Sequence, residues 1–196
     1  MSKLNAAFEH FDAYNKRDPN TFIWDEVSYP QEYFLAVKLY DWVNQLDPNA
    51  SEELLLASRS QHIGRWEIPR NTYPEGREAY LKWRKDLAQY HTEKAAAIME
   101  TVGYSPDQIA RVKQIHLKQK IKVDHDVQTM ENALCLVFLQ FQYEDFHPKY
   151  ETDKVINILK KSLLKMDAHG HSFALGLNYS EKGMYYIQEA LKLIKK

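Results

Sequence analysis

Apolar residues recur every three or four positions along most of the chain, which is the pattern of amphipathic α-helices. Glycine and proline are sparse, 6 and 7 in all, and they fall at the boundaries of the periodic segments. We therefore expect an all-α fold, a single-domain bundle of about eight helices over residues 1–196. The expected helices begin near Leu4, Pro30, Ser51, Glu75, Ser105, Asp124, Thr152 and Ser180.

Capping and helix-breaking residues indicate where some of these helices begin and end. Ser105 followed by Pro106 combines an N-cap with proline at the first helical position, which favours a helix start. Residues 64–74 carry two prolines and a glycine and are expected to form an ordered loop. A second loop is expected over residues 170–178, and the last helix is expected to end at Lys196.

From Asp124 onward, the sequence MENALCLVFLQFQY (residues 130–143) is apolar on nearly all sides, which predicts a buried helix. Residues 133–139, with the sequence ALCLVFL, also allow a buried strand. We favour the helix because the chain offers no other good strand to pair with this one.

Charge and cysteine content narrow the functional classes. Lys and Arg total 26 against 27 Asp and Glu, giving a net charge of about −1, which argues against nucleic-acid binding through bulk charge. No apolar run reaches the roughly 20 residues that span a bilayer. The first 20 residues carry scattered charges and do not match a signal peptide, and Cys135 is the only cysteine. We expect a cytoplasmic protein that binds no membrane.

Five arginines and several aromatic residues are concentrated between residues 59 and 91. The forked guanidinium group matches two oxygens of a phosphate or carboxylate at once, so this density favours a small anionic ligand. Trp66 and Tyr73 are candidates to flank a base attached to that ligand. The alternative is a solvated surface on which the arginines pair with nearby carboxylates. The candidate anion-binding residues are Arg59, Arg65, Arg70, Arg77 and Arg84.

Arg77, Arg84 and His91 follow one another in steps of two helical turns, so they are expected to share one stripe of the fourth helix. His91, His62 and Glu131 would together supply two imidazoles and a carboxylate to one divalent transition metal (Mn, Fe, Ni or Zn). Such a metal generates hydroxide at neutral pH. The alternatives are hydrogen-bonded structural histidines and a salt-bridged or capping Glu131.

Three segments resemble one known family. They are SQHIGRWEIPRNTYPEGREAYLKWRKDLAQYHTEKAAAIM, VDHDVQTMENALCLVFLQF and TDKVINILKKSLLKM. All three are similar to a bacterial and fungal family catalogued only as domain of unknown function forty-two-oh-two. The resemblance covers about residues 30–177. It implies the family's fold and carries no reaction, because none is established for the family.

More distantly, the helix order is similar to that of the HD-domain metal phosphohydrolases. That resemblance places His62 where those enzymes have a His-Asp doublet, although Ile63 stands where the aspartate is expected. It implies that His91 and Glu131 take the places of later metal ligands and that Glu32 lies near the place of a first one. The implied fold is a degenerate HD-like domain with one metal or none.

These observations leave several functions open. The first is an HD-like protein that binds a small phosphorylated ligand, such as a nucleotide, and hydrolyses it with one metal. The second is a non-catalytic module that senses an anion or nucleotide or binds another protein. A local RNA-contacting patch is a third, disfavoured by the neutral charge. The 13 tyrosines are also compatible with a homodimer surface.

Overall fold

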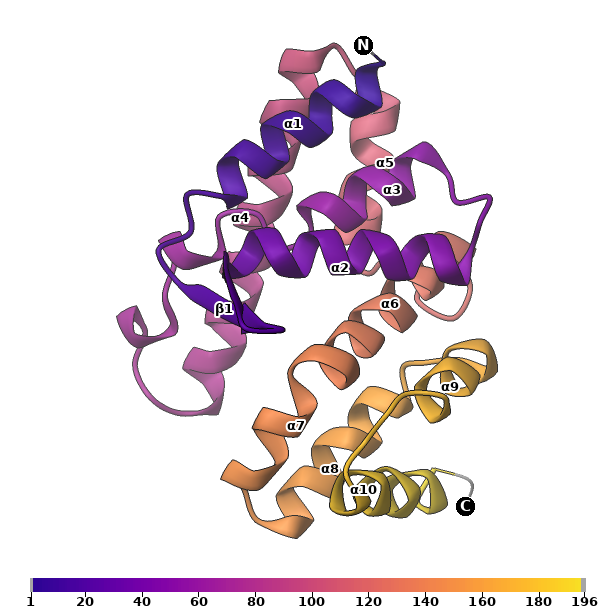
Figure 1. Ribbon diagram of the computed structural model, residues 1–196. Coiled ribbons are helices and arrows are strands. Elements are labelled where there is room, and N and C mark those ends of the chain that lie inside the picture. The colour runs from indigo at the N-terminus through magenta and orange to yellow at the C-terminus, as the bar shows by residue number, and fades with distance from the viewer. Residues whose placement is uncertain (1, 195–196) are drawn as a thin grey trace. The chain divides into compact units, whose positions relative to one another are not determined.

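The computed structural model describes residues 2–194 and is mostly helical, with ten α-helices and one two-stranded sheet in that range (Figure 1). The all-α prediction is confirmed in this broad form, while the count of eight is not. The helices are α1 (Lys3–Asn15), α2 (Gln31–Leu46), α3 (Glu52–Ser60), α4 (Arg77–Val102), α5 (Pro106–His116), α6 (His125–Phe141), α7 (Tyr143–Phe146), α8 (Thr152–Leu163), α9 (Ala168–Leu175) and α10 (Glu181–Lys192).

The sheet is an antiparallel hairpin of β1 (Thr21–Trp24) and β2 (Val27–Pro30) that the helical periodicity did not predict. Its two-residue turn places Asp25 and Glu26 at φ 50° and 63°. Two consecutive positive φ angles match the twist of the flanking strands. The turn lacks the Asn-Gly or Asp-Gly pair that usually marks such a hairpin, so the sequence signal was weak.

The expectation of a loop over residues 170–178 was wrong, because α9 occupies most of that segment. Asp167 caps this helix by accepting a hydrogen bond from the backbone of Gly170 at 2.9 Å. Gly170 packs so closely on α6 that an added Cβ would lie 2.6 Å from Oδ1 of Asn132. The glycine therefore permits close helix packing here instead of ending a helix.

Other boundaries agree with the capping signals. Ser105 forms a complete capping box with Gln108, and Pro106 is the first residue of α5. The loop over residues 64–74 contains two short 3-10 turns, η1 (Arg65–Glu67) and η2 (Arg70–Thr72), and a third, η3 (His147–Lys149), follows α7. The last helix is described to Lys192, and the expected end at Lys196 lies outside the described residues.

The chain forms two compact units, which we describe separately. The first contains Met1–Asp41 and Asn49–Gln119. In it α5 packs on α3 and α4, and α1 packs on the same two helices (Figure 1). Large side chains that are fully buried there include Phe11, Leu54, Leu56, Ile63, Met99 and Ile115.

The second unit contains Trp42–Pro48 and Lys120–Lys196. Within it α6 packs on α7 and α9, and α8 packs on α10. As predicted, α6 is buried on nearly all sides. Cys135 of this helix is 7% exposed, and its Sγ–H points to the carbonyl oxygen of Ser162 at 3.7 Å. No helix in the described part of the chain is long and apolar enough to cross a membrane.

Candidate functional site

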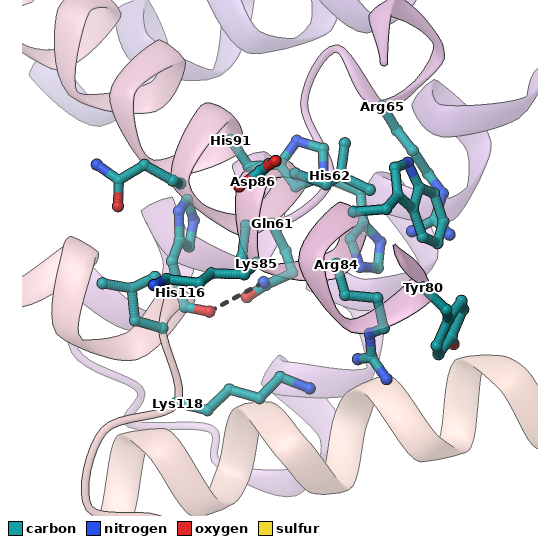
Figure 2. Close-up of a pocket in the computed structure, with 15 residues that line it drawn as sticks. Gln61, His62, Arg65, Tyr80, Arg84, Lys85, Asp86, His91, His116 and Lys118 are labelled. Atoms are coloured by element: carbon teal, nitrogen blue, oxygen red, sulfur yellow. Dashed lines mark hydrogen bonds between the residues drawn. The ribbon is translucent and has the colours of Figure 1, made fainter. Parts of the chain in front are cut away.

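A pocket of about 900 Å³ lies within the first unit (Figure 2). Its wall is built from residues just after α3, from α4 between Tyr80 and His91, and from the end of α5 and the two residues after it. Helix α4 contributes Tyr80, His91 and every residue from Trp83 to Gln89. Among these, Arg84, Leu87 and His91 recur every three or four positions and lie along one stripe of the helix. The expected stripe therefore does bring Arg84 and His91 to the same cavity.

Four cationic side chains line the pocket together with one carboxylate, that of Asp86. This carboxylate accepts hydrogen bonds from the hydroxyl of Tyr73 at 2.9 Å and from the ammonium of Lys82. Both partners favour its charged form and lower the pKa of Asp86. Its charge is thus already engaged by partners of its own. The four cationic residues are Arg65, Arg84, Lys85 and Lys118 (Figure 2).

Lys118 is held in an unusual backbone conformation. Its φ of 55° lies in the left-handed region, which disfavours residues with a Cβ. The residue comes two positions after the end of α5 and reaches the pocket with its side chain. A glycine would adopt this conformation with less strain, so the lysine costs some stability at this position.

Three histidines line the same pocket: His62, His91 and His116. The rings of His62 and His91 have centroids 5.8 Å apart. Burial lowers the pKa of His91 to about 3 and that of His116 to about 4. Burial, with the positive charge of Arg65 nearby, holds the pKa of His62 well below its usual value. All three imidazoles are therefore neutral at pH 7.

The five predicted arginines are placed differently. Arg65 and Arg84 line the pocket. Arg59 pairs with Asp12 through two hydrogen bonds of 2.8 and 2.7 Å, and Arg70 donates to backbone carbonyls of its own loop. The guanidinium groups of Arg59 and Arg70 are thus bonded within the protein and stabilise its folded structure. Arg77 is exposed at the first turn of α4 and is not among the residues that line the pocket.

The predicted aromatic residues lie beside the pocket wall and not in it. The Trp66 ring packs against Tyr14, with centroids 5.8 Å apart. Tyr73 supports Asp86, as described above. The aromatic side chains that line the cavity are instead Tyr80 and Trp83, and the Trp83 indole N–H donates to the carbonyl of Ile68 at 2.9 Å.

Of the four predicted metal ligands, the structure brings His62 and His91 together. Glu32, at the start of α2, is 3% exposed, and its Oε1 lies 3.8 Å from Nε of Arg65. Glu131 belongs to the second unit, where its Oε1 lies 3.3 Å from Nζ of Lys165. Within residues 2–194, no three His, Cys, Asp or Glu side chains are grouped so that they could hold a metal ion. The metal centre stays a prediction, of which the structure places two of the four ligands side by side.

Sequence reasoning missed Gln61, Lys85, Lys118 and His116. Lys85 directly follows Arg84 in the sequence, so it lies outside the helical stripe of Arg77, Arg84 and His91. His116 follows the buried Ile115 at the end of α5. Only this apolar context hinted that its ring is inside the protein, and nothing local showed that α5 lies beside α3 and α4.

Comparison with protein families matches residues 5–187 to the family described as a domain of unknown function, DUF4202. No curated protein matches the chain, and no solved structure does. The family match covers most of the sequence and includes every residue of the pocket. The chain belongs to the DUF4202 family.

Proposed function

We propose that the pocket of the first unit binds a small phosphorylated molecule. The observation that carries this proposal is the charge of the lining: four cationic side chains face one carboxylate, and that carboxylate is bound to Lys82 and Tyr73. Neither Arg84 nor Lys85 forms an ion pair with another residue of the described chain. Their charges are available to a ligand.

Arg65 adds to this positive potential. Its nearest carboxylate is Glu32 at 3.8 Å, and burial raises the pKa of Glu32 to about 7. At neutral pH that carboxyl group is protonated in a large share of the molecules, so it neutralises Arg65 only in part. The guanidinium lies over the Trp83 ring, 5.6 Å from its centroid, which holds it in place at the pocket wall.

The first prediction concerns Arg84. In Arg84→Glu we expect the affinity for pyrophosphate to fall about 10- to 100-fold, because one charge-assisted contact is lost and a repulsive charge replaces it. Isothermal titration calorimetry at 50 mM and 200 mM salt would measure it. Lys161→Glu is the matched control, since it makes the same charge change on α8, in the second unit. Pyrophosphate binding that is absent, or equal in both variants, would contradict the proposal.

A separate assay of phosphate release distinguishes binding from turnover. The natural protein is incubated with pyrophosphate, with and without Mn²⁺ or Zn²⁺, and released phosphate is measured. The proposal is of binding, and it requires saturable heat in the presence of EDTA. Hydrolysis that appears only with an added metal would support a metal-dependent phosphohydrolase, which is part of the first function expected from the sequence.

The second prediction concerns Lys118. We expect Lys118→Gly to raise the free energy of unfolding by about 0.5–1 kcal/mol, because glycine relieves the left-handed backbone strain. We expect pyrophosphate affinity to fall at least threefold in the same variant, because a lining charge is removed. Urea denaturation and calorimetry measure the two effects. Lys122→Gly is the control: its φ is 68° and it does not line the pocket, so it should gain stability with unchanged binding.

A further inference from the structure

Three buried side chains that line the pocket have unpaired polar atoms, which a phosphate group would not satisfy. These side chains are Gln61, His91 and His116. Each has one polar atom that finds no hydrogen-bond partner within the described residues: Oε1 of Gln61, Nε2 of His91 and Nδ1 of His116. The chemical nature of these three atoms decides what the ligand must offer.

The tautomer of His91 follows from its backbone contact. Its Nδ1 lies 2.7 Å from the carbonyl oxygen of Ile63. A carbonyl only accepts, so Nδ1 carries the proton and donates it. Because burial keeps the ring neutral at pH 7, Nε2 has no proton. The unpaired atom of His91 is therefore a hydrogen-bond acceptor.

The tautomer of His116 is fixed in a similar way. Its Nε2 lies 3.2 Å from the carbonyl oxygen of Ala57 and 3.1 Å from Oγ of Ser60. The Ser60 hydroxyl donates its own proton to the carbonyl of Leu56 at 2.7 Å, so at Nε2 it accepts. Nε2 must carry the proton, and Nδ1 of His116 is a second unpaired acceptor.

The orientation of the Gln61 amide follows from the neighbouring backbone. Its nitrogen donates to the carbonyl oxygen of His116 at 3.3 Å, the contact drawn as a dashed line in Figure 2. This contact leaves the amide oxygen as the unpaired atom, a third acceptor. Buried acceptors without partners are rare in proteins and destabilising, so a polar ligand that pairs with them binds favourably.

We propose that the ligand is a phosphorylated polyhydroxyl compound, a sugar phosphate, whose phosphate lies among the cationic side chains and whose hydroxyl groups donate to Gln61, His91 and His116. This inference rests on the proposed function of the pocket. Ammonium donors are repelled by Arg65, Arg84, Lys85 and Lys118, and a second anionic group would meet three lone pairs. Neutral hydroxyl groups suit both surroundings. A pocket of about 900 Å³ accommodates a molecule of this size.

Calorimetric titration with two matched probes tests the inference. Glucose 6-phosphate and cyclohexylmethyl phosphate share a six-membered ring and a phosphate, and only the first has hydroxyl groups. We expect glucose 6-phosphate to bind at least tenfold more tightly, in the presence of EDTA. In Gln61→Met, which removes the acceptor together with the amide donor to the His116 carbonyl, the ratio of the two affinities should fall at least threefold. His116→Asn, checked for folding by circular dichroism, is the second variant.

The outcomes separate this inference from the proposed function. Equal binding of both probes by the natural protein would overturn the sugar-phosphate assignment and leave the phosphate pocket standing. Binding of neither probe, nor of pyrophosphate, would overturn both. Tight binding of glucose 6-phosphate that requires Mn²⁺ or Zn²⁺ and is abolished by EDTA would also overturn the hydroxyl assignment, because the three acceptors would then serve a cation.

Discussion

Acidification from pH 7 to pH 5 is expected to remove about 4 kcal/mol of stability through His91 and His116 together. Burial lowers the pKa of His91 to about 3 and that of His116 to about 4, against about 6.5 in the unfolded chain. The unfolded state therefore binds protons at pH 5 while the folded state does not. For such lowered pKa values, stability is present above pH 6.5 and is lost as the pH falls.

Urea denaturation at half-unit steps from pH 7.5 to pH 4.5 measures this effect. His116→Asn serves as the comparison, since the asparagine amide still donates hydrogen bonds but does not titrate. We expect the variant to lose about 2 kcal/mol less than the natural protein over the same interval. The slope against pH is the readout, so a general loss of stability in the variant does not disturb the comparison. Parallel slopes would contradict a buried neutral His116.

Glu32→Gln is expected to stabilise the protein by about 3 kcal/mol at pH 8 and to have little effect at pH 4.5. Burial raises the pKa of Glu32 to about 7, and its Oε2 finds no partner within the described residues. For a carboxyl with a raised pKa, the folded state prefers the protonated form. Its contribution is full below about pH 4.5 and is lost as the pH rises to 7. Glutamine imitates the protonated form at every pH.

Glu32 and the histidines oppose each other between pH 5 and pH 7. Protonation of Glu32 returns about 2 kcal/mol over that interval, so the natural protein should lose about 2 kcal/mol less than Glu32→Gln between pH 7 and pH 5. Denaturation curves of the two proteins at pH 5, 7 and 8 give all of these values. If the two proteins differ by the same amount at each pH, Glu32 does not titrate in this range.

Most of the helices could be predicted from the sequence, because their boundaries are set by local chemistry. The serines at positions 51, 105 and 180 each cap a helix with the side-chain oxygen, as such residues do in isolated helices. The hairpin and α9 could not be predicted in this way. Asp25 and Glu26 are weak turn formers. Helix α9 does have a local N-cap in Asp167, but Gly170 in its first turn has a low helix propensity, which obscures the signal.

The candidate site was predictable in part for the same reason. Helical periodicity brings Arg84 and His91 to one face of α4, and this needs no knowledge of the fold. The role of Arg59 depends on Asp12, 47 residues away in the sequence, whereas Arg70 donates to carbonyls of its own loop. Likewise His116 reaches the pocket because α5 packs on α3 and α4. Contacts between residues far apart in the sequence cannot be predicted from the spacing of residues within one segment.

The burial of Cys135 has a practical consequence. An accessible thiolate attacks electrophilic thiol reagents, but the only cysteine of the sequence lies on α6, is buried, and has its Sγ directed at a carbonyl oxygen. The natural protein is therefore close to unreactive toward maleimides while folded. A cysteine introduced at Gln89, an exposed residue of the pocket wall, would carry a fluorophore or spin label almost alone, and ligand occupancy could be followed without first removing the native thiol.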